Sequence, residues 1–181
     1  MALEDKDLVA RVVATGDQNA FATLVRRHQS SVRALLRRLC AGDHALADDL
    51  AQETFLRAHR HLDRFRGDAK LSSWLYRIAY NTYLSHARKK SSQELPLEEG
   101  REGEAAAPAE LTLARHDLNR AFAVLRPEER AALSMTYGRD LDHEEAASIL
   151  GMPLGTLKTH VRRGKEKLRK KLKAWQNEVV A

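Results

Sequence analysis

The stretch from Asp142 to Lys165 has the most informative residue spacing in the chain. Ala147 is followed by Gly151 after four residues and by Leu157 after six more. A helix–turn–helix needs this order: a small residue where two helices cross, a glycine that accepts a positive backbone angle in the turn, and an aliphatic residue that holds the second helix on the first. The spacing therefore predicts two packed helices joined by a tight turn.

The second of these helices, expected over about 154–175, is strongly basic. An α-helix fits the major groove of DNA, where side chains near its N-terminus reach base edges and the remaining cations neutralise phosphates. An ordinary helical hairpin with a basic exposed face is the alternative. Spacing, turn residue and charge agree, which favours DNA binding. The candidate DNA-contacting residues are Thr156, Lys158, Thr159, Arg162, Arg163 and Lys165.

The N-terminal half contains a second polar and aromatic set. Residues 48–57, Asp-Asp-Leu-Ala-Gln-Glu-Thr-Phe-Leu-Arg, mix acidic and amide groups with apolar ones, as an interface with an apolar core and a polar rim does. The expected helix over 71–90 is aromatic and ends in a basic run, which suits single-stranded nucleic acid. Core packing is the alternative for the aromatic residues: we favour it for Phe55 and Trp74, and leave Tyr80 and Tyr83 open.

These residues must be positioned by helices. Ala, Leu, Arg and Glu dominate the composition, only four prolines and nine glycines interrupt it, and apolar residues recur every three or four positions without strand-like alternation. Asp17, Asp43 and Asp142 are expected N-caps, and Pro127 suits a first helical turn. The expected helices cover about 4–14, 18–41, 44–62, 71–90, 111–124, 127–138, 142–150 and 154–175.

Charge divides the chain of 181 residues into blocks. The net charge of +6 is distributed as +6 over residues 1–92, −5 over 93–113 and +5 over 114–181. We therefore expect an all-α protein of two small helical domains, each meeting a polyanion. Residues 1–92 and 111–175 would form the domains, 93–110 a flexible acidic linker and 176–181 a tail.

Several classes of function are not expected. No apolar run approaches the length of a membrane span and residues 1–7 lack a signal core, so we expect a cytoplasmic protein without membrane insertion. Cys40 is the only cysteine and is expected to be at least half-buried. The eight histidines have no metal-ligand spacing, and neither a phosphate-binding glycine loop nor a catalytic constellation is present. We expect no cofactor, no metal and no enzymatic activity.

Together, these motifs resemble a known family. Residues 48–57, the segment Phe65-Arg66-Gly67-Asp68 and residues 74–81 are similar to conserved region 2 of the extracytoplasmic-function (group 4) sigma factors. Residues 125–130, which lead into the helix–turn–helix, resemble region 4 of the same family. The similarity covers about 1–92 and 111–175, in the family's order and without an intervening region 3.

The resemblance implies that the helix over 44–62 docks on the β′ clamp helices of RNA polymerase, and that the β flap is a further contact of the enzyme. The expected polymerase-binding residues are Asp48, Asp49, Gln52, Glu53, Phe55 and Leu56.

The resemblance also implies that the loop over 63–72 and the next helix open the promoter −10 element and capture a flipped base, and that the basic helix reads the −35 element. The expected −10 residues are Phe65, Arg66, Gly67, Asp68, Lys70, Ser72, Arg77, Asn81 and Arg88. Two positions depart from the family: Arg162 replaces a common aromatic or His, and Gly164 stands mid-helix where Ala is common.

The implied function is that of a dissociable specificity subunit that directs core RNA polymerase to promoters. A separate anti-sigma protein is expected to control it. The alternative is a self-sufficient DNA-binding regulator that uses the same helix–turn–helix, but that alternative leaves residues 44–92 unexplained.

Overall fold

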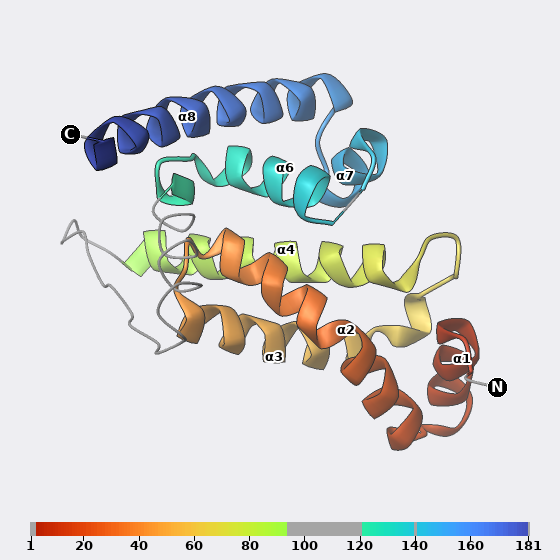
Figure 1. Cartoon of the computed structure of the whole chain (residues 1–181). Helices are drawn as coiled ribbons and strands as arrows, with labels where there is room; N and C mark the ends of the chain where they lie inside the picture. The colour runs from red at the N-terminus through yellow and green to blue at the C-terminus, as the bar shows by residue number, and fades with distance from the viewer. Residues whose placement is uncertain (1–2, 94–120, 140, 181) are drawn as a thin grey trace. The chain divides into compact units, whose positions relative to one another are not determined.

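The computed structural model describes residues 3–93, 121–139 and 141–180, and the side chains of residues 90–93 and 174–180 are left aside. Every regular element in this part of the chain is helical, which confirms the all-α expectation (Figure 1). The chain divides into two compact units, one of residues 1–36 and 48–99, the other of residues 37–47 and 100–181. The expected domain limits and the helix over 111–124 lie largely outside the described residues and stay predictions.

The first unit is built on four α-helices and one short 3-10 helix. Their bounds are α1 Asp5–Thr15, α2 Gln18–Leu39, α3 His44–Arg60, η1 Leu62–Arg64 and α4 Leu71–Gln93. The last residues of α2 and the first of α3 fall in the segment grouped with the second unit. These helices begin and end within about three residues of the positions expected from periodicity.

Aspartates start two of these helices, as the sequence predicts. The carboxylate of Asp17 accepts hydrogen bonds from the backbone N–H groups of Asn19 (2.9 Å) and Ala20 (3.0 Å). Asp43 accepts from the N–H of Leu46 at 3.0 Å. Each bond satisfies a backbone donor that the first turn of a helix leaves without an intrahelical partner. The N-terminal ends of α2 and α3 are therefore fixed by local chemistry.

A buried face on each helix forms the core of the first unit. On α4 the positions Leu71, Leu75, Ala79 and Tyr83 recur every four residues and are all buried. Tyr80, one turn before Leu84, is also buried at 6% exposure. The tyrosines left open by the sequence are therefore structural.

The second unit contains α6 Pro127–Gly138, α7 His143–Leu150 and α8 Leu154–Val180, and each of these three helices contacts the other two. Pro127 occupies the first turn of α6, as expected. α8 continues past its expected end at 175. Among the described residues, no helix combines the length and apolarity that crossing a bilayer requires.

Candidate nucleic-acid interface

The turn between α7 and α8 has the geometry that the sequence predicts. Asp142 caps α7 by accepting from the backbone N–H of Glu145 at 2.7 Å. Gly151 follows α7 with φ of 64°, in the left-handed region, and the N–H of Met152 bonds back to the carbonyl of Ala147 at 3.1 Å. Glycine accepts this backbone angle without the steric penalty that a Cβ brings.

Buried side chains then hold α8 in place. Leu157 is fully buried and Val161 nearly so, on one face of α8. Gly164 lies on the same buried face. A Cβ built on it would approach Cδ1 of Leu133, on α6, to 2.7 Å. The glycine that departs from the family pattern therefore permits a close approach of α8 to α6, which the sequence did not indicate.

An ion pair between a buried carboxylate of α6 and a partly exposed lysine of α8 adds to this contact. Oε2 of Glu129 on α6 accepts from the backbone N–H of Arg126 at 3.0 Å and from Nζ of Lys167 on α8 at 2.8 Å. Burial by itself would raise the pKa of Glu129, but these hydrogen bonds and the nearby positive charges hold it below its ordinary value. The link of Glu129 to Lys167 has no signal in the sequence.

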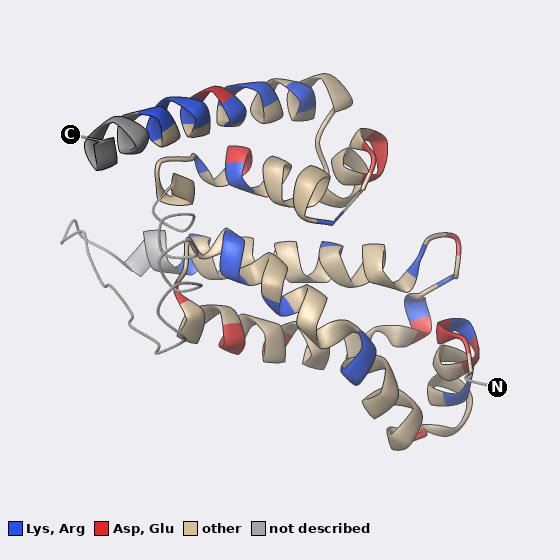
Figure 2. Ribbon diagram, viewed as in Figure 1, with Lys and Arg blue, Asp and Glu red and all other residues tan. Residues whose placement is uncertain are grey.

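The candidate −35 residues lie on α8, and one of them, Lys165, places its Nζ 4.4 Å from the centre of the Tyr137 ring of α6. Lys and Arg recur along this helix (Figure 2). The Thr159 hydroxyl donates to the carbonyl of Gly155 at 2.9 Å, and Arg162 pairs with Glu166 at 3.2 Å, both largely exposed. An exposed pair of this kind is weak and can open when a phosphate or base edge competes. Thr159 is half-buried, and the exposed candidates are Thr156, Lys158, Arg162, Arg163 and Lys165.

The loop before α4 and one face of α4 carry the candidate −10 residues. The ring of Phe65 is half-buried against Trp74, with centroids 5.6 Å apart. The sequence favoured a core position for Trp74, but the structure places it half-buried. Ser72 is half-buried, and the exposed candidates are Arg66, Gly67, Asp68, Lys70, Arg77, Asn81 and Arg88.

Helical spacing gathers part of this set. Lys70, Arg77, Asn81 and Arg88 are separated by seven, four and seven residues, so they follow one face of the helix and the residue preceding it. Cations therefore flank the single amide on an exposed surface. Such an arrangement suits a strand whose phosphates meet the cations while a base edge meets the amide.

The candidate polymerase-binding residues lie on α3. Asp49, Gln52 and Leu56 are exposed, and Leu56 is 54% exposed although it is apolar. The other three are half-buried: Asp48, Glu53 and Phe55. Glu53 bonds Arg57 at 2.6 Å, and that hydrogen bond is the main reason its pKa is lowered.

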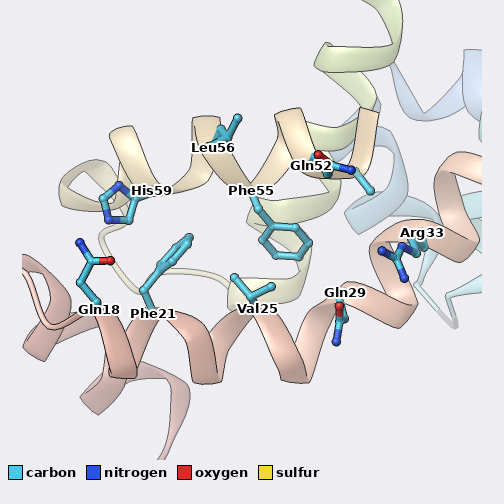
Figure 3. A pocket seen from close by; sticks show the side chains of 10 residues that line it. Gln18, Phe21, Val25, Gln29, Arg33, Gln52, Phe55, Leu56 and His59 are labelled. Atoms are coloured by element: carbon cyan, nitrogen blue, oxygen red, sulfur yellow. The ribbon is translucent and has the colours of Figure 1, made fainter. Parts of the chain in front are cut away.

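A groove of about 500 Å³ runs between α2 and α3. Phe55 and His59 of α3 point toward Phe21 and Val25 of α2 across it, whereas Leu56 lies at its edge and points away from α2 (Figure 3). The Phe21 ring meets that of His59 edge-on at 4.6 Å. Phe55 was favoured as core, yet it lines this groove. The sequence did not identify the α2 side, because helical periodicity cannot separate half-buried apolar residues from buried ones.

Cys40 is half-buried, as expected. Burial, reinforced by the charge of Asp43, raises the pKa of its thiol to about 12, so the thiol stays protonated at neutral pH. Among the described residues, the metal-ligating side chain types form no group of three suited to an ion.

Comparison with known proteins identifies both halves of the chain. Residues 24–93 match the family model for Sigma-70 region 2, and residues 115–168 match that for Sigma-70 region 4. The ECF RNA polymerase sigma-E factor of Escherichia coli K12 is 35% identical, with 94% of this chain and 95% of that protein aligned. SigW, an ECF RNA polymerase sigma factor of Bacillus subtilis, is 33% identical, with 89% and 93% aligned.

Solved structures agree with these matches. The sigma factor RpoE, in its complex with the anti-sigma factor NepR from Bartonella quintana, superposes with a TM-score of 0.73 at 27% identity, covering 84% of this chain and 96% of that one. CnrH, solved with the cytosolic domain of CnrY, gives 0.69 at 27% identity, covering 94% and 97%. The chain therefore belongs to the extracytoplasmic-function RNA polymerase sigma factors, which direct core polymerase to start transcription at specific promoters.

Proposed function

We propose that three exposed surfaces divide the work of this sigma factor. The acidic and apolar surface of α3 binds the β′ clamp helices, the stripe around Asn81 with the preceding loop captures the opened −10 strand, and the outer face of α8 reads the −35 duplex. The β flap contacts the second unit. The main support is that every candidate residue is exposed or half-buried, and that none of them belongs to the buried core.

The chemistry of each surface matches its partner. Phosphates attract the cations on α4 and α8, whereas the Asp49 carboxylate and the Leu56 side chain on α3 suit a protein surface with cations at its rim. The three surfaces are separate, so each role can be removed alone. A regulator that binds duplex DNA without polymerase would need only α8.

A transcription assay tests the proposal. Core polymerase supplied with this chain is given a library of promoter fragments, and the start sites are mapped. We expect initiation at specific promoters that depends on both proteins. Tight duplex binding without polymerase, combined with no specific initiation across the library, would support the self-sufficient regulator instead.

The Asp49→Lys variant tests the α3 surface. Because Asp49 is exposed, its reversal should leave the circular dichroism spectrum unchanged. Binding to core polymerase should weaken by about tenfold, because the lysine would face like charges at the cationic rim proposed for the partner. Lys158→Glu on α8 is the matched control, which should bind polymerase normally but lose −35 affinity. An Asp49→Lys chain that unfolds would show that this residue is structural.

We propose further that an anti-sigma protein holds the chain inactive by covering the α2–α3 groove. RpoE of Bartonella quintana, a structural neighbour, was solved with the anti-sigma factor NepR, and the groove places apolar side chains beside the amide groups of Gln18, Gln29 and Gln52. Purification of the chain at native abundance should recover a separate inhibitory protein. Added core polymerase should displace that protein from the chain. Recovery with polymerase alone would contradict this part of the proposal.

A further inference from the structure

Helix α1 lies outside the segment matched by the region 2 family model, which begins at residue 24. The helix is nevertheless well formed. The side chain of Asp7 accepts from the N–H of Glu4 at 3.2 Å at its start, and Gly16 ends it with φ of 69°. Leu8, Val9 and Val12 form a buried face. α1 is therefore an ordered element for which the proposed division of work gives no role.

A clasp of hydrogen-bonded side chains, formed by Asp5, Arg27 and His28, joins α1 to α2. The Asp5 carboxylate receives a hydrogen bond from Nη1 of Arg27 at 2.9 Å and lies 2.7 Å from Nε2 of His28. Burial alone would raise the pKa of Asp5, but the bonds to Arg27 and His28 lower it below its ordinary value. Asp5 is thus ionised at neutral pH, where the clasp is complete.

The ends of α1 and α2 are tied a second time. Nη2 of Arg11 on α1 donates to Asp17 at 2.6 Å, and Asp17 also caps α2. The short connection between the helices is therefore held by its own cap, and α1 has little freedom to swing away from α2.

The other neighbour of α1 is η1. The two elements contact each other, and α1 lies beside the turn that precedes α4 (Figure 1). Leu62 of η1 is buried at 3% exposure. η1 leads directly into Phe65 and the exposed residues 66–70, which form the proposed base-capturing loop. A brace on η1 therefore acts at the point where this loop leaves the body of the unit.

The charge of α1 argues against direct contact with DNA. Its first turn carries Asp5 and Asp7, Glu4 precedes them, and its last turn has no basic residue. Phosphates would be repelled by this end. Arg11, the one arginine of the helix, is already paired with Asp17. The helix is thus suited to hold its neighbours rather than to bind a strand.

We infer that α1 is a brace for the base-capturing loop, and that Asp5 is a positioning residue which, through Arg27 and His28, holds α1 against α2 and η1. The inference rests on the proposed role of residues 65–72 in capturing the −10 strand. Loss of the clasp should allow the junction between η1 and the base-capturing loop to move. Capture of the strand should then weaken, while the surfaces on α3 and α8 keep their affinities.

The test uses full-length chain with core polymerase and measures three affinities: for core polymerase, for the −35 duplex, and for the non-template −10 strand of a promoter selected in the transcription assay. Asp5→Ala and Arg27→Gln remove the clasp from its two sides. Each should lower −10 strand affinity about fivefold and change the other two by less than about twofold. Lys6→Gln, in the same turn but paired only with exposed Glu4 among the ion pairs of the described residues, should change none of them.

Rescue separates positioning from general stability. Asp5→Arg combined with Arg27→Asp restores an opposite-charge pair, and it should recover strand affinity relative to Asp5→Arg alone. Unchanged strand affinity in Asp5→Ala would overturn the inference, as would an equal fall of all three affinities. If the unmodified holoenzyme itself fails to capture the strand, the proposed loop function falls first, which is a different result.

Discussion

Gly164 shows how one residue can satisfy opposing demands. A glycine inside a helix is less favourable than alanine by about 1 kcal/mol, and from the sequence this position shows only that penalty. The structure adds the packing of α8 against α6, where a Cβ on Gly164 would also lie 3.5 Å from Cβ of Glu129. The missing side chain is therefore part of the seam between the two helices.

Replacing Gly164 by alanine should lower the free energy of unfolding by about 1 kcal/mol, since overpacking against buried Leu133 exceeds the gain in helix propensity. Gly155 on the same helix has no atom within 4 Å of its added Cβ. Gly155→Ala should therefore stabilise the chain, by about 0.5 kcal/mol. Urea denaturation followed by circular dichroism measures both. A stabilised Gly164→Ala chain would mean that Leu133 yields freely.

The Glu129–Lys167 pair should make stability depend on pH. The folded pKa of Glu129 lies below its unfolded value, so its contribution is present above the unfolded pKa and is lost as pH falls through the folded one. Lys167→Met should reduce stability by about 1–2 kcal/mol at pH 7, a value kept low because Lys167 is 39% exposed.

The deficit should shrink as the solution is acidified through the folded pKa of Glu129, below which its carboxyl is protonated in both chains. Denaturation curves recorded from about pH 3 to about pH 7 measure how the stability deficit of the variant changes with pH. Lys170→Met, at an exposed position of the same helix, is the control. A deficit that stays constant with pH would assign the role of Lys167 to packing alone.

At the scale of the element, the α7–α8 turn depends on the backbone angle of Gly151. Gly151→Ala should destabilise the second unit by about 1 kcal/mol, because a Cβ is disfavoured at φ of 64°. Gly151→Asn should be milder, since asparagine tolerates this region better. Both are measured by urea denaturation, together with −35 duplex affinity. Equal stability of all three chains would show that the turn relaxes to another conformation.

Local chemistry made the helices predictable. Asp17, Asp43 and Asp142 each cap a helix as expected, because a cap involves residues two or three positions apart. The contact of Gly164 with Leu133 and the pair of Glu129 with Lys167 join residues 31 and 38 positions apart. Helical periodicity relates only residues that are close in sequence, so these two contacts could be found only in the structure.

The candidate sites divide in the same way. The exposed residues of α4 and α8 follow from helical spacing and from the family resemblance. The α2 side of the groove and the clasp of Asp5 with Arg27 and His28 could not be predicted in this way. Residue type alone reveals neither the burial of Phe21 nor the partners of Asp5.

At the scale of the whole molecule, the two units should contribute separately to promoter use. Arg163→Ala on α8 should weaken promoter binding by about 1–3 kcal/mol if Arg163 contacts a base. Asn81→Ala on α4 should leave −35 duplex binding intact but reduce strand opening, as detected by permanganate reactivity of −10 thymines in the holoenzyme complex.

The double variant tests independence. Arg163 and Asn81 belong to different compact units, so the free-energy effects of the two substitutions on open-complex formation should add within about 0.5 kcal/mol. Arg162→Ala combined with Arg163→Ala, neighbours on one helix, provides the contrasting case. A large coupling between Asn81 and Arg163 would show that duplex reading and strand opening are one event.

The arrangement of α8 bears on how such a protein acquires a new set of target genes. Leu157, Val161 and Gly164 secure one side of the helix, while Lys158 and Arg162 are exposed and lie outside that buried contact. Substitutions among the outward residues can therefore accumulate in a duplicated copy without unfolding it. Promoter preference is free to diverge over generations while the scaffold beneath it stays the same.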